Sequence, residues 1–107
     1  MELNNDIFEK QLREHSGPVL LFFVSEVCGP SYAMQMTIDE LESLPVSLCE
    51  IDIQAQPAIG MHYKIRGTPL LMLTQNAKPI TSRIGTQSAK QIEEWLEKSL
   101  DKLKGQS

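Results

Sequence analysis

The sequence predicts an α/β fold in which helices cover both faces of a mixed β-sheet of about four to five strands. The clearest sign is the apolar run 19–24, VLLFFV. It is rich in β-branched and aromatic side chains and too short for a helix, which is typical of a buried strand. Strand and helix patterns then follow one another in βαβ and ββα order, and about four helices are expected.

The N-terminal segment predicts one helix followed by the long strand. Asn4 or Asn5 can cap this helix, which is expected to end near 16–18. Only residues 1–3 precede the helix, so an N-terminal edge strand is expected to be short or absent. The long strand is expected over 18–24.

The middle of the chain predicts a second helix and a second strand. Proline suits the first turn of a helix, so a helix is expected from Pro30 to about 43–44. Residues 46–53 alternate as a strand does but carry Cys49 and Ile51 on the second face as well. This pattern favours a central strand covered on both sides, with Cys49 as a buried, inert side chain.

The C-terminal half predicts a short helix, a hairpin and a long amphipathic helix. Ser88 and Gln91 have the spacing of a capping box at the start of the last helix. The expected ranges are 57–63 for the short helix, 70–74 and 79–84 for the hairpin strands around 76–78, and 88–103 for the last helix.

Composition narrows the functional class. The 107 residues are expected to form a single domain, 1–107, with 41% hydrophobic and 22% charged residues. A net charge of −4 with scattered Lys and Arg excludes a phosphate-backbone site, so no nucleic acid partner is expected. The polar N-terminus and the lack of a membrane-length apolar stretch predict no signal peptide and no membrane span. Two cysteines predict no disulfide framework. We expect a cytoplasmic monomer.

Cys28 is the strongest candidate for chemistry. It stands where the strand pattern ends and the helix pattern begins. Unpaired backbone N–H groups and the positive end of the helix dipole stabilise a thiolate at such a position. We therefore expect the pKa of Cys28 to lie below that of a free cysteine.

Cys28-Gly29-Pro30-Ser31 resembles the Cys-Gly-Pro-Cys motif of thioredoxins, with Ser31 in place of the second cysteine. The likeness continues in the segment 63–69, in the strand after it, in Ile84-Gly85 and in the last helix. It implies the thioredoxin fold and a cis peptide bond between Thr68 and Pro69. It further implies a substrate groove around Cys28 formed by Val27, Gly29, Pro30, Gly67, Thr68, Pro69, Ile84 and Gly85.

The resemblance implies thiol–disulfide exchange without a cofactor or metal. Cys28 can attack a substrate disulfide, but the Ser31 hydroxyl cannot resolve the mixed disulfide. Turnover is therefore impaired, and protein disulfides are the expected substrates, with thioredoxin reductase or glutathione as thiol source. Ser31 is either a natural monothiol variant or an engineered trap.

Three residues depart from the thioredoxin pattern. Phe22 stands where the family has a buried aspartate that carries a proton, Glu50 where it has a lysine, and Val27 where it has a tryptophan. These departures suit a protein without the resolving step. Alternatively, Glu50 supplies the proton-carrying carboxylate from the neighbouring strand.

Two other functions stay open. A non-catalytic module could keep the groove to bind a protein partner. Cys28-Gly29-Pro30-Ser31 also resembles the Cys-Gly-Phe-Ser motif of monothiol glutaredoxins, which hold an iron–sulfur cluster with glutathione. His15 and His62 are expected at the surface, without a catalytic role.

Overall fold

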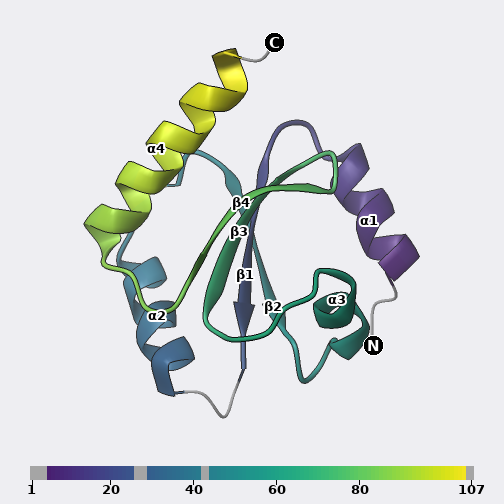
Figure 1. The fold of residues 1–107 in the computed structure, drawn as a ribbon, viewed down its shortest axis with the longest axis horizontal. Helices are drawn as coiled ribbons and strands as arrows, with labels where there is room; N and C mark the ends of the chain where they lie inside the picture. The colour runs from purple at the N-terminus through teal and green to yellow at the C-terminus, as the bar shows by residue number, and fades with distance from the viewer. Residues whose placement is uncertain (1–4, 26–28, 42–43, 106–107) are drawn as a thin grey trace.

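The computed structural model describes residues 5–25, 29–41 and 44–105, drawn in Figure 1. Within these ranges the predicted α/β fold is confirmed: a mixed sheet of four strands is flanked by four helices. The elements are α1 (Asn5–Glu14), β1 (Val19–Val24), α2 (Gly29–Glu40), β2 (Ser47–Asp52), α3 (Pro57–His62), β3 (Leu70–Gln75), β4 (Lys78–Ile84) and α4 (Ala89–Gly105). The expected N-terminal edge strand falls on residues 1–3, outside the described residues.

The strands lie in the order β2-β1-β3-β4. β1 runs parallel to β2 and antiparallel to β3, and β3 and β4 form an antiparallel hairpin. Asn76 and Ala77 connect the hairpin with φ values of 54° and 68°. Positive φ at both turn residues matches the right-handed twist of the flanking strands.

β1 lies inside the sheet with both of its faces covered. Figure 1 shows α2 and α4 on one face and α1 and α3 on the other. Leu20 and Phe22 belong to the core on the α2–α4 side, whereas Leu21 and Phe23 belong to the core on the α1–α3 side. Burial on both faces explains why β1 is a continuous apolar run rather than an alternating one.

The prediction of a central position for residues 46–53 is wrong. β2 is an edge strand, because it pairs with β1 on one side and with no other strand in the described part of the chain. Ser47, Leu48 and Glu50 are exposed, Cys49 is half-buried, and only Ile51 is buried. Cys49, Ile51 and Ile53 contact the α1–α3 core and Val46 contacts the α2–α4 core, while Leu48 is exposed.

The capping box at the start of α4 is confirmed. The backbone N–H of Gln91 donates to the Ser88 hydroxyl at 3.2 Å, and the backbone N–H of Ser88 donates to the Gln91 side-chain carbonyl at 2.9 Å. These bonds satisfy N–H groups that a helix start leaves unpaired. Ile92, Trp95 and Leu96 then bury the apolar face of α4 against the sheet.

Candidate active site

The segment with the predicted nucleophile reaches the start of α2. Val27 and Cys28 lie outside the described residues, as do the side chains of Pro30 and Ser31. Gly29 is the first residue of α2 and is exposed, with nothing within 4 Å of the position that a Cβ would take. Cys28 therefore directly precedes, in sequence, a helix N-terminus with its unpaired N–H groups and positive dipole end.

The second segment of the predicted site is the loop before β3. The Thr68–Pro69 peptide bond is cis, and Pro69 is buried while Thr68 is half-buried. The antiparallel register pairs Leu70 with Phe23, so β3 begins beside the end of β1. The Pro69 loop and the strand that leads towards Cys28 are thus neighbours.

The third segment is the end of β4. The backbone N–H of Gly85 donates to the carbonyl of Pro69 at 2.8 Å, and Gly85 has a φ of 89° that suits glycine. Ile84 Cδ1 lies 3.2 Å from the position that a Cβ on Gly67 would take. The structure therefore brings together Gly67, Pro69, Ile84 and Gly85 from two segments that are far apart in the sequence.

Exposed apolar side chains occur on these segments. Ile84 is 61% exposed, and Tyr32, in the first turn of α2, is 72% exposed. Water-exposed apolar side chains beside a candidate site suit contact with a partner. The sequence analysis did not include Tyr32 in the site, although an aromatic residue directly after Ser31 could have indicated a contact residue.

Glu50 lies on the exposed edge strand β2. It pairs in register with Phe22, so both side chains project from the same sheet face, the one covered by α2. Desolvation by partial burial raises the pKa of the Glu50 carboxyl, and the charges of Asp39 and Asp52 raise it further. A carboxyl with a raised pKa exchanges protons more readily near neutral pH.

Cys49 is half-buried and packs against the α1–α3 core. Burial raises the pKa of its thiol, and the neighbouring Glu50 charge raises it further. A thiol with a raised pKa is less often the reactive thiolate at neutral pH. The predicted inert character of Cys49 therefore has a physical basis, although its burial is less complete than expected.

Both histidines are exposed and have partners away from the predicted groove residues. The ring Nε2 of His15 lies 3.0 Å from the Ser47 hydroxyl, and His62 forms an ion pair with Glu9. Within residues 5–25, 29–41 and 44–105, no three His, Cys, Asp or Glu side chains gather to hold a metal. In the same ranges, no helix has the length and apolar character to cross a membrane.

Comparison with known proteins identifies the family. The thioredoxin family model matches residues 1–98. Thioredoxin of Rickettsia felis is 32% identical over 96 residues, covering 87% of this chain and 91% of the relative. Thioredoxin of Buchnera aphidicola subsp. Schizaphis graminum is 26% identical over 103 residues, covering 94% and 95%. A mutant thioredoxin from Halobacterium salinarum NRC-1 has a similar structure, with a TM-score of 0.78, 20% identity and coverage of 92% and 88%. The chain therefore belongs to the thioredoxin family of thiol–disulfide oxidoreductases.

Proposed function

We propose that this protein carries out thiol–disulfide exchange through Cys28 and forms mixed disulfides with protein substrates. The observation that carries the proposal is the family match over residues 1–98, together with a cysteine directly before the first residue of α2. A helix N-terminus stabilises a thiolate, which is the form of cysteine that attacks a disulfide. The protein acts as a single-domain monomer in a reducing cytoplasmic environment.

The exchange begins with a covalent intermediate between Cys28 and the substrate. The Cys28 thiolate attacks one sulfur of a substrate disulfide, a new S–S bond forms, and the second substrate sulfur leaves as a thiolate that takes up a proton. Ser31 has no thiol with which to attack this mixed disulfide. An outside thiol, from glutathione or thioredoxin reductase, attacks the Cys28 sulfur instead, releases the reduced substrate and forms a disulfide with Cys28. A second outside thiol attacks that disulfide and frees the Cys28 thiolate.

The groove residues and Glu50 have supporting roles in this proposal. An extended substrate segment lies along Thr68 and Pro69, with Ile84 and Gly85 on one side and Val27, Gly29 and Pro30 on the other. Glu50 carries the proton to the leaving thiolate, and the raised pKa of its carboxyl supports that role.

A non-catalytic binding module is the second candidate, because Ser31 replaces the resolving cysteine. In such a module the groove holds a partner without covalent exchange, and the Cys28 thiol has ordinary reactivity. The reactivity of Cys28 therefore separates the two functions.

An aromatic disulfide reagent that releases a coloured thiolate tests the proposal. The unsubstituted protein and Cys49→Ser are expected to react rapidly at neutral pH and to carry the adduct on Cys28 by mass mapping. Cys28→Ser is expected to react slowly. If Cys28 reacts no faster than a cysteine in an unstructured peptide, the binding module replaces the exchange protein.

A further inference from the structure

Two hollows lie along the junction of β4 and α4, beside the end of β4 that carries Ile84. They have volumes of about 170 and 380 Å³ and share Arg83, Trp95 and Lys98, so they adjoin each other and are described together as one groove. We call it the β4–α4 groove. Its charged lining residues are Arg83, Glu94, Lys98 and Lys102, and Ile80, Thr81 and Trp95 also line it.

The indole of Trp95 forms the floor of the β4–α4 groove and is held by a hydrogen bond. Trp95 is only 6% exposed, and its Nε1–H donates to the Thr81 hydroxyl at 3.4 Å. This bond links α4 to β4 across the groove. Because the indole is almost fully buried, it fixes the packing of α4 against β4 beneath the groove.

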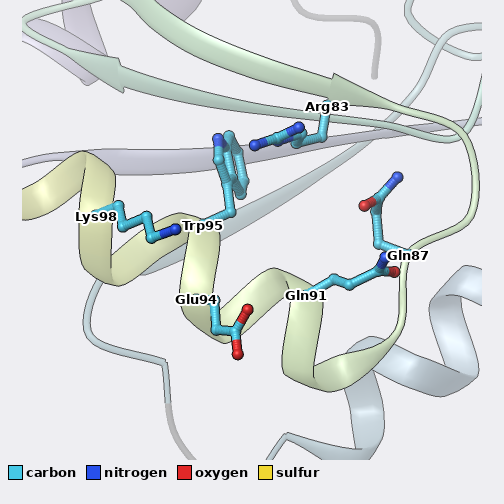
Figure 2. A pocket seen from close by; sticks show the side chains of 6 residues that line it. All are labelled: Arg83, Gln87, Gln91, Glu94, Trp95 and Lys98. Atoms are coloured by element: carbon cyan, nitrogen blue, oxygen red, sulfur yellow. The ribbon is translucent and has the colours of Figure 1, made fainter.

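The rim of the groove is cationic in an acidic protein. Figure 2 shows Arg83 reaching from β4 and Lys98 from α4 towards Trp95, whereas Glu94 points away from it. Among the described residues, no salt bridge involves Arg83, Lys98 or Lys102. The whole chain has a net charge of −4. These three cations, which form no salt bridge, therefore give the groove a positive charge on an otherwise acidic protein.

The charges of α4 are sorted between two sides of the helix. Lys98 and Lys102 line the β4–α4 groove, while Glu93, Glu97 and Asp101 line a separate hollow on the side of residues 44–45. Glu94, four residues before Lys98, is the one carboxylate that lines the groove beside its three cations. The charged side chains that line the groove are therefore three cations and one carboxylate, an excess of positive charge.

β4 adds an open sheet edge to the groove. It is the last strand in the sheet order, and every residue except the half-buried Thr81 is exposed. No strand pairs with its outer edge in the part of the chain that the structure describes. Pro79 has no N–H to donate, so the stretch 80–84 is the part of the edge that can pair with an added strand.

We propose that the β4–α4 groove binds an extended acidic peptide segment of a partner protein. The segment pairs with the edge of β4 at 80–83, and its carboxylates meet Arg83, Lys98 and Lys102. Edge pairing supplies backbone hydrogen bonds, and the cations select the sequence.

This interaction is separate from thiol exchange at Cys28. Thr81 and Arg83 pair with Leu73 and Leu71 and share their sheet face on the α4 side, whereas Ile84 pairs with Leu70 and lies on the opposite face. A partner can therefore occupy the groove while the segments around Pro69 stay accessible. The proposed docking of a partner in the groove does not depend on the reactivity of Cys28.

Trp95 is the only tryptophan of the chain, so its fluorescence reports directly on the groove. The probe is a blocked nine-residue peptide of alternating Glu and Val, titrated into the full chain at low salt. We expect a saturable change in emission that weakens as salt is added, because salt screens the charge pairs. The matching Lys-Val peptide is expected to give no change.

A pair of charge-reversed variants makes the test specific. Lys98→Glu is expected to weaken peptide binding at least about tenfold, equivalent to about 1.4 kcal/mol. Lys90→Glu makes the same change of net charge on α4 outside the groove and is expected to leave binding nearly unchanged. Backbone amide shifts on binding should centre on 80–83.

Three results would overturn the proposal. One is the absence of saturable binding at low salt, and another is an equal loss of binding in Lys98→Glu and Lys90→Glu. The third is an equal response to inorganic phosphate at the same concentration, which would make the groove a site for small anions only. Because none of these measurements uses Cys28, their failure leaves the proposed exchange function untouched.

Discussion

Glu50 lies opposite Phe22 in the parallel pairing of β1 and β2, and its side chain projects from the sheet face that α2 covers. Phe22 is completely buried there, while Glu50 at the sheet edge remains exposed. The one side chain of this pair that can carry a charge is therefore the one in contact with water. Partial burial and the charges of Asp39 and Asp52 nevertheless raise the pKa of its carboxyl above the ordinary 4.5.

The first prediction concerns Glu50→Gln. Because the pKa of Glu50 is raised in the folded state, the folded protein binds more protons than the unfolded chain just above pH 4.5. Stability is therefore lost as the pH rises through that window. Glu50→Gln should flatten this dependence and raise the free energy of unfolding at pH 7 by less than about 0.5 kcal/mol, since the carboxyl is exposed and screened.

Urea unfolding between pH 4 and pH 7 measures this effect, with the exposed Glu97→Gln on α4 as control. If Glu50 also carries a proton in thiol exchange, Glu50→Gln should slow release of the substrate thiol and Glu97→Gln should not. An unchanged pH dependence in Glu50→Gln would contradict the raised pKa. An unchanged release rate would remove Glu50 from the exchange mechanism.

The second prediction concerns the two thiols. Burial and Glu50 raise the pKa of Cys49, whereas a helix N-terminus lowers that of a cysteine placed before it. Iodoacetamide at neutral pH should therefore label Cys28 well before Cys49, as mass mapping of a time course can show. Unfolding in urea should bring the two rates together. Earlier labelling of Cys49 in the folded protein would refute the activation of Cys28.

The third prediction concerns Ser31→Cys. A thiol at this position can attack the mixed disulfide on Cys28, which a hydroxyl cannot do. Ser31→Cys should therefore gain multiple-turnover reduction of insulin disulfides with a thioredoxin reductase, while the unsubstituted protein stays near background. Ser31→Ala serves as control, since it removes the hydroxyl without adding a thiol. A folded Ser31→Cys variant without turnover would favour the binding module.

Local patterns predicted much of this fold. The apolar run of β1, the Ser88–Gln91 capping box and the turn residues at 76–77 each depend on neighbours in sequence. Such features act within a few residues, so they can be read before the tertiary structure is known. The segments around Pro69 and Gly85 were found through the resemblance to thioredoxins, because no local pattern shows that their backbones share a hydrogen bond.

What could not be predicted depends on distant pairing. The sequence of β2 has apolar residues on both faces, and only the strand order of the described residues places the strand at an edge. The β4–α4 groove likewise exists because α4 docks beside β4 and brings Lys98 near Arg83. Neither cation forms a motif in the sequence, so only the packed structure reveals the cluster.

The last prediction concerns Gly85→Ala. Gly85 has a φ of 89°, and its N–H donates to the carbonyl of Pro69 at 2.8 Å. Nothing lies within 4 Å of the position that a Cβ would take, so the substitution adds backbone strain without a clash. We expect a loss of about 1–3 kcal/mol in the free energy of unfolding, typical of a non-glycine residue held in a sparsely populated region.

Gly105→Ala is the matched control for Gly85→Ala. Gly105 is the last residue of α4, its Cβ position is also open, and it has no positive φ. Alanine favours helix, so this variant should be unchanged or up to about 1 kcal/mol more stable in urea unfolding. If Gly85→Ala relaxes its φ, the bond to Pro69 is lost and mixed-disulfide formation should slow as well. Equal stability of the two variants would show that the backbone at Gly85 is not strained by a side chain, and that this bond does not hold the Pro69 loop.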